Sequence, residues 1–126
     1  MLFCAVLAVV VYARIMWNGF TYDDYLVIAD NPHLGRPGFV QACFSDRYFA
    51  VSGEATYRPV VTLVYALLAR VAGSGPMVFH AASLFFHVLT VLGVILLARC
   101  LGLGRWAFAA GAAFAVPPML TEAVCG

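Results

Sequence analysis

The sequence has little charge and no lysine. Only 10% of its 126 residues are charged, against about a quarter in an ordinary soluble protein. The seven basic residues are all arginines, and they are scattered, so no basic block is present that could bind nucleic acid or an anionic membrane surface. We therefore expect no nucleic-acid partner. With 64% hydrophobic residues, the composition instead indicates an integral membrane protein.

Metal-binding cysteine motifs are also missing. The four cysteines, Cys4, Cys43, Cys100 and Cys125, show no CxxC or comparable spacing. We interpret them as buried thiols. Cys43 and Cys125 could face the same extracytoplasmic side, but nothing in the sequence brings them together, so we do not expect a disulfide there.

Three apolar runs predict membrane spans, because one crossing needs about 20 mostly apolar residues. The expected spans cover residues 2–17, 77–101 and 106–120. Arg99 and Arg105 flank the short loop between the last two spans and place it in the cytoplasm by the positive-inside rule. The sequence thus predicts an all-α membrane protein whose long loop, residues 18–76, is extracytoplasmic. Since the chain stops just after the third run, we expect a fragment of a larger multi-spanning bundle.

Two helices are expected to lie at the membrane surface within this loop. Apolar residues recur at helical spacing over residues 39–48. A second apolar pattern covers 59–71, where Pro59 suits a first helical turn. About a dozen apolar residues are short for a crossing. The alternative is a tilted span, which would invert the topology of everything that follows.

An acidic pair, Asp23 and Asp24, follows the first apolar run in a chain with only six acidic residues. A carboxylate inside the bilayer is costly, so this pair should lie at the mouth of a span or in a wet cavity. There, one carboxylate could act as a general base toward a hydroxyl, or the pair could hold a divalent metal ion, the only candidate cofactor. The alternative is a pair of solvated loop residues.

A polar stripe runs along the second expected span. Its members, spaced to lie on one helix face that should look inward, are His80, Ser83, His87 and Thr90. The stripe could border a wet cavity and bind an anionic ligand, or it could hydrogen-bond to neighbouring helices. The functional interpretation is stronger for His80, which is nearer the outer end, and packing is favoured for the deeper His87.

Two further charged residues are candidates on the extracytoplasmic side. Arg58 opens the second surface helix, where a guanidinium is well placed to bind a phosphate. Simple contact with lipid headgroups is the alternative. Glu122 lies just beyond Pro117 and Pro118, on the same side as Asp23 if the topology is right.

The order of several short motifs resembles the N-terminal part of the transmembrane and tetratricopeptide-repeat O-mannosyltransferases, a family of C-type-fold membrane glycosyltransferases. The motifs are Asn-Gly-Phe-Thr-Tyr-Asp-Asp-Tyr from residue 18, Asn-Pro-His-Leu from 31, Tyr-Arg-Pro from 57, Phe-His from 79 with a second His at 87, and Thr-Glu-Ala-Val from 121. The resemblance covers essentially the whole chain.

This resemblance implies a transferase that moves a sugar, with mannose as the candidate, from a polyprenyl-phosphate carrier to a protein hydroxyl on the extracytoplasmic side. It implies that Asp23, Asp24 and Glu122 are catalytic and that Arg58 matches a basic residue at the membrane surface. Arg58 and His80 would then bind the carrier phosphate. The expected location is multi-pass in a bacterial inner membrane or the endoplasmic reticulum.

The chain also departs from the family. The family usually has His-Pro-x-His before Thr-Glu-Ala-Val, whereas this chain has Val-Pro-Pro-Met-Leu from residue 116. The family also has more spans and usually a repeat domain, so we expect this segment alone to be inactive and to need the remaining helices of a longer chain. The rival hypothesis is a non-catalytic membrane module that only mediates helix packing.

Overall fold

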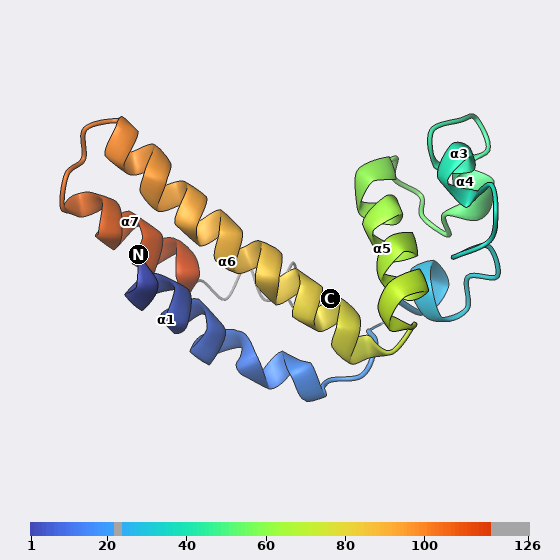
Figure 1. The fold of residues 1–126 in the computed structure, drawn as a ribbon, viewed down its shortest axis with the longest axis horizontal. Coiled ribbons are helices and arrows are strands. Elements are labelled where there is room, and N and C mark those ends of the chain that lie inside the picture. Colours follow the sequence, from blue (N-terminus) through green and yellow to red (C-terminus); the bar gives the residue numbers. More distant parts are fainter. Residues whose placement is uncertain (22–23, 117–126) are drawn as a thin grey trace. The chain divides into compact units, whose positions relative to one another are not determined.

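The computed structural model describes residues 1–21 and 24–116, and every regular element within these ranges is a helix (Figure 1). The all-α prediction is therefore confirmed for this part of the chain. The chain forms two compact units. The first comprises Met1–Asn18 with the chain from His80 onward, and the second comprises Gly19–Phe79.

The first unit packs three apolar helical segments. They are α1 (Leu2–Tyr12), which continues into the 3-10 helix η1 (Ala13–Trp17), most of α6 (Pro76–Cys100), and α7 (Trp106–Ala115). On α7 the buried residues recur every fourth position and are all small: Ala107, Gly111 and Ala115. Small side chains on one helix face let neighbouring helices approach closely. A Cβ added at Gly111 would collide with the side chain of Ile95 on α6.

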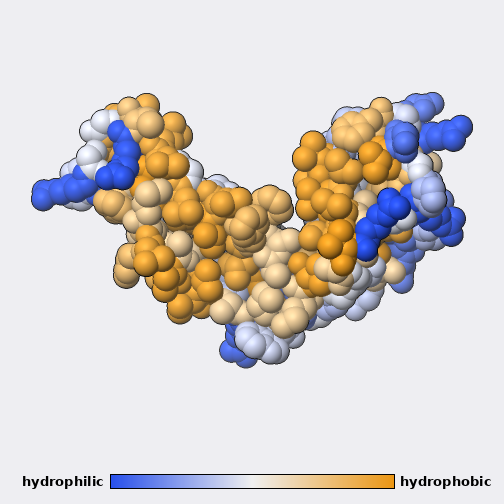
Figure 2. All heavy atoms as spheres, viewed as in Figure 1, coloured by the Kyte–Doolittle hydropathy of each residue, from blue (hydrophilic) through white to orange (hydrophobic). Residues whose placement is uncertain are grey.

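One described helix, α6, is long and apolar enough to cross a membrane, by length and composition. It has 25 residues, and only 22% of its most apolar window is buried within the protein. The runs expected to form the first and third spans give shorter apolar helices, and the end of the third run lies outside the described residues. Figure 2 shows that apolar side chains cover much of the visible surface. Such a surface suits contact with lipid or with further helices.

Before α6, the described residues of the second unit form four short or medium helices. They are the π-helical turn η2 (Tyr25–Ala29), α3 (Phe39–Cys43), α4 (Tyr48–Val51) and α5 (Pro59–Ala72). One helix was expected over residues 39–48, but the structure has two. The hydroxyl of Ser45 accepts the N–H of Arg47 at 3.2 Å and donates to the carbonyl of Ala42 at 3.1 Å. These local bonds compete with helical backbone pairing and separate α3 from α4.

Two apolar clusters hold the second unit together. In one, Phe39 and Cys43 of α3 and Tyr48 of α4 pack against Ala66 of α5. In the other, Val27 and Ile28 of η2 pack with Phe79, and Tyr65 of α5 meets the Phe79 ring at 5.7 Å between centroids. The clusters pack η2, α3 and α4 against α5. The candidate site lies in the loop that leads into α5.

The cysteine prediction is partly wrong. Cys4 and Cys43 are buried, as expected, but Cys100 is exposed at the end of α6. Burial raises the pKa of the Cys43 thiol. Cys125 lies outside the described residues.

Candidate functional site

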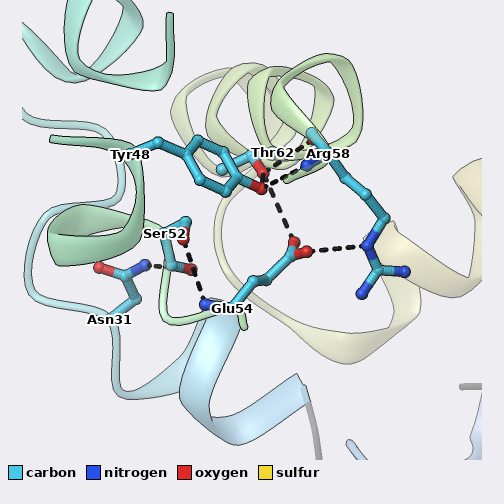
Figure 3. A network of polar contacts seen from close by, with 6 residues as sticks. All are labelled: Asn31, Tyr48, Ser52, Glu54, Arg58 and Thr62. Atoms are coloured by element: carbon cyan, nitrogen blue, oxygen red, sulfur yellow. Dashed lines mark hydrogen bonds and ion pairs between the residues drawn. The ribbon is translucent and has the colours of Figure 1, made fainter. Parts of the chain in front are cut away.

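An ion pair between Glu54 and Arg58 lies at the entrance to α5. Glu54 comes from the loop after α4, and Arg58 immediately precedes Pro59 at the start of α5. The Arg58 Nε donates to Glu54 Oε2 at 2.9 Å (Figure 3). The Glu54 side chain is 3% exposed, whereas that of Arg58 is 57% exposed. A buried carboxylate therefore anchors an accessible guanidinium.

Two buried hydroxyls continue the network. The backbone N–H of Arg58 donates to the Tyr48 hydroxyl oxygen at 2.9 Å. The Tyr48 and Thr62 hydroxyl oxygens are 2.9 Å apart. In the simplest arrangement Tyr48 gives its proton to Thr62, whose own proton goes to the Arg58 carbonyl at 3.1 Å or to Glu54 Oε1 at 3.4 Å. Tyr48 and Thr62 are fully buried, so their bonds are shielded from water.

Hydrogen bonds from Ser52 and Asn31 fix the loop that carries Glu54. The Ser52 hydroxyl accepts the Glu54 backbone N–H at 3.2 Å. The Asn31 side-chain amide donates to the carbonyls of Val51 at 2.9 Å and Ser52 at 3.2 Å. Gly53 has φ +74°, and a Cβ there would collide with the backbone carbonyl of Leu26. These contacts constrain the backbone on either side of Gly53 and so hold Glu54 in place.

This arrangement leaves the end of the Arg58 guanidinium available. Only its Nε has a side-chain partner in the described part of the chain, and the two terminal nitrogens point away from Glu54 in Figure 3. The terminal edge of a guanidinium can hold two phosphate oxygens at once. Arg58 was predicted from the sequence but Glu54 was not, because Glu54 lies in a loop and no helix joins the two residues.

Asp24 contributes charge to the same region. Its carboxylate accepts the backbone N–H and the hydroxyl of Thr21, each at 3.0 Å. The pKa of the Tyr65 phenol on α5 is raised, first by burial and then by the negative charges of Asp24 and Glu54, while the positive charge of Arg58 lowers it. Asp24, Glu54 and Arg58 are thus close enough to influence one phenol.

The other expected catalytic acids, Asp23 and Glu122, lie outside the described residues. Among the residues that the structure does describe, no group of three His, Cys, Asp or Glu side chains could hold a metal ion. A metal site that includes Asp23 stays a prediction.

The residues of the polar stripe on α6 differ in burial. His80 and His87 are buried. The His87 ring packs edge-on against Tyr12 at 5.0 Å and stacks near Phe114 at 6.1 Å, and its Nε2 is 3.5 Å from the Ala115 carbonyl. Packing between α1, α6 and α7 therefore accounts for His87.

Thr90, at the far end of the stripe, does not match the expectation that all four residues face the protein interior. Thr90 is exposed, and its hydroxyl donates to the Phe86 carbonyl of its own helix at 2.9 Å. The two expected phosphate ligands belong to different units, Arg58 to the second and His80 to the first.

The chain is similar over nearly its whole length to named protein O-mannosyl-transferases. It is 33% identical over 132 residues to protein O-mannosyl-transferase Tmtc2 of Drosophila melanogaster, covering 99% of this chain and 14% of that protein. Against Drosophila Tmtc1 the identity is 34% over 129 residues, covering 98% and 15%. Against human TMTC1 it is 31% over 129 residues, covering 91% and 14%.

The chain is thus similar to one segment of this O-mannosyl-transferase family, as a fragment of that family would be. It spans about one seventh of the length of these relatives. No family model matches the sequence, and no solved structure matches it. These matches confirm the resemblance to this family as a whole.

Proposed function

We propose that this chain forms the donor-binding part of a membrane O-mannosyltransferase, and that Arg58 binds the phosphate of a polyprenyl-phosphate-linked sugar. The carrying observation is the Glu54–Arg58 pair, in which a buried carboxylate fixes Nε while the terminal nitrogens stay accessible. An arginine held in this way loses less side-chain freedom when it binds an anion. The assignment of His80 to the carrier phosphate stays a prediction from the sequence.

The transfer step assigns the acids as follows. Asp23 takes the proton from the acceptor hydroxyl as its oxygen attacks the anomeric carbon of the sugar. The bond from that carbon to the carrier phosphate oxygen breaks, and its electron pair leaves with the polyprenyl phosphate. Asp24 orients Asp23, or the two carboxylates would together hold a divalent metal ion. Glu122 contacts the acceptor or would contact that metal.

The acceptor is a protein hydroxyl, and the reaction takes place on the extracytoplasmic side. In this proposal α6 is one of several spans of a multi-pass protein in a bacterial inner membrane or the endoplasmic reticulum. Further helices of a longer chain would cover the exposed apolar surface of the first unit and complete the enzyme.

The competing function is a helix-packing module without catalysis. It is supported by His87, which packs among α1, α6 and α7, and by the small-residue face of α7. A packing module has no reason to bind a polyprenyl phosphate, so carrier binding separates the two functions.

The test is binding of a polyprenyl monophosphate to the purified chain in detergent micelles. Arg58→Gln should weaken binding by about tenfold or more, since a charge-assisted hydrogen bond contributes about 1.5–3 kcal/mol. Arg47→Gln is the matched control. Like Arg58, Arg47 directly precedes a helix, here the short α4, but it has no ion pair within the described ranges. Absence of binding, or equal losses in the two variants, would favour the packing module.

A further inference from the structure

A separate shallow groove lies between α3 and α5 in the second unit. Apolar side chains and two arginines line it: Gly35, Arg36, Phe39, Val40, Leu63, Ala66, Leu67 and Arg70. Figure 2 shows strongly apolar side chains along α5 with hydrophilic groups close by. Leu67 is 60% exposed and Val40 is 43% exposed, so the apolar floor is accessible.

The two arginines lie on the same rim. Gly35 has φ +81°, and the position of a Cβ there would be 3.9 Å from the Cγ of Arg70. The stem of Arg70 therefore passes beside Gly35, the residue next to Arg36. Both arginines are exposed, neither forms an ion pair within the described residues, and no acidic side chain lines the groove.

The groove thus combines a doubly cationic rim with an apolar floor. Arg70, in the last turn of α5, also complements the negative end of the helix dipole, but that role does not explain Arg36. Guanidinium groups bind phosphate oxygens, and interfacial arginines bind anionic lipid headgroups. The exposed side chains of Val40 and Leu67 offer apolar contact to the hydrocarbon that follows such a headgroup.

We propose that the groove between α3 and α5 binds an anionic phospholipid, with its phosphate on Arg36 and Arg70 and the start of an acyl chain on the apolar floor. The site is distinct from the carrier site at Arg58. Arg58 and Arg70 lie at opposite ends of α5, and a rise of 1.5 Å per residue separates their backbones by about 18 Å. Lipid binding here does not depend on glycosyl transfer.

The experiment measures lipid binding to the purified chain in uncharged detergent by native mass spectrometry. Phosphatidylglycerol should bind more tightly than phosphatidylcholine. Arg36→Gln with Arg70→Gln should weaken phosphatidylglycerol binding by about 30-fold, because an arginine near an anionic lipid contributes about fivefold. Replacing both with lysine should preserve most of the preference and show that the groove tolerates substitution.

The control removes the same amount of charge elsewhere. Arg47→Gln with Arg105→Gln lowers the net charge by two without touching the groove, and it should leave the lipid preference intact. Equal losses in the two double variants would overturn the proposal, because they would show a general charge effect. So would equal binding of the two lipids. Glycerol 3-phosphate that binds as tightly as phosphatidylglycerol would show a phosphate site without a lipid role and would also overturn it.

Discussion

Replacing Thr62 with Val tests whether the buried hydroxyl network stabilises the entrance to α5. The substitution keeps the β-branched shape and removes one hydroxyl, the group that lies 2.9 Å from the Tyr48 hydroxyl. Tyr48 is fully buried, so its O–H would lose its acceptor without gaining water. An unsatisfied buried donor costs about 1–3 kcal/mol, and the expected loss in the free energy of unfolding is of this size.

The chain offers a matched control in Thr90. It is also a helical threonine, but it is exposed, and within the described ranges its hydroxyl bonds to the Phe86 carbonyl alone. Thr90→Val should change stability by no more than about 0.5 kcal/mol. Unfolding of each variant would be followed by circular dichroism as a denaturing detergent is added to mixed micelles.

A double-mutant cycle then isolates the contact between the two hydroxyls. Tyr48→Phe should cost less in the Thr62→Val background than in the original chain, with a coupling free energy of about 0.5–3 kcal/mol. Equal stability of the two valine variants, or fully additive costs for Tyr48 and Thr62, would refute the network as a stabilising element.

Three further predictions concern charge, backbone and topology. Asp24→Asn should lower the raised pKa of Tyr65, although burial still keeps that pKa above its ordinary value. The titration is followed by tyrosinate absorbance, and the curve of a Tyr65→Phe variant is subtracted to isolate Tyr65. The stability from this raised pKa is present below the ordinary value of about 10 and is lost as pH rises through the folded-state pKa; an unshifted titration would contradict the placement of Asp24. Gly53→Ala should destabilise the chain by about 1–3 kcal/mol, because Gly53 has φ +74° and its Cβ would meet backbone, whereas Gly75→Ala, which meets nothing within 4 Å, should have little effect on unfolding. Cys100, exposed at the end of α6, should react with an impermeant maleimide only from the cytoplasmic face. Labelling from the other face would show that the real topology is the reverse of the expected one.

Elements with strong local signals were predictable from the sequence. The expected helix at 59–71 is α5 (Pro59–Ala72), where Pro59 suits the first turn and Gly73 follows the end. The run at 77–101 matches α6, a helix of 25 residues whose sequence is apolar on average and has no internal proline. Arg58 was identified for the same reason, since it stands directly before a clear helix start.

Features that helical periodicity does not encode were not predictable. The periodicity over residues 39–48 suggested one helix, but side-chain bonds from Ser45 to the backbone divide it. Glu54 looks like an ordinary loop acid, and its burial depends on Tyr48 and Thr62 from two different helices. Thr90 fits the spacing of an inward stripe, yet helical spacing fixes only which residues share a face and not whether another helix covers that part of it.

The most direct test of catalysis is mannose transfer from a polyprenyl-phosphate donor to a hydroxyl-bearing peptide, measured in membranes that carry an intact homologous enzyme with the substitution made at the position that matches Asp23. Asp23→Asn should abolish transfer while membrane insertion and binding of the polyprenyl phosphate stay unchanged, because the amide cannot accept the acceptor's proton. Transfer that persists in the Asp23→Asn variant at the original rate would contradict the assignment of Asp23 as the base.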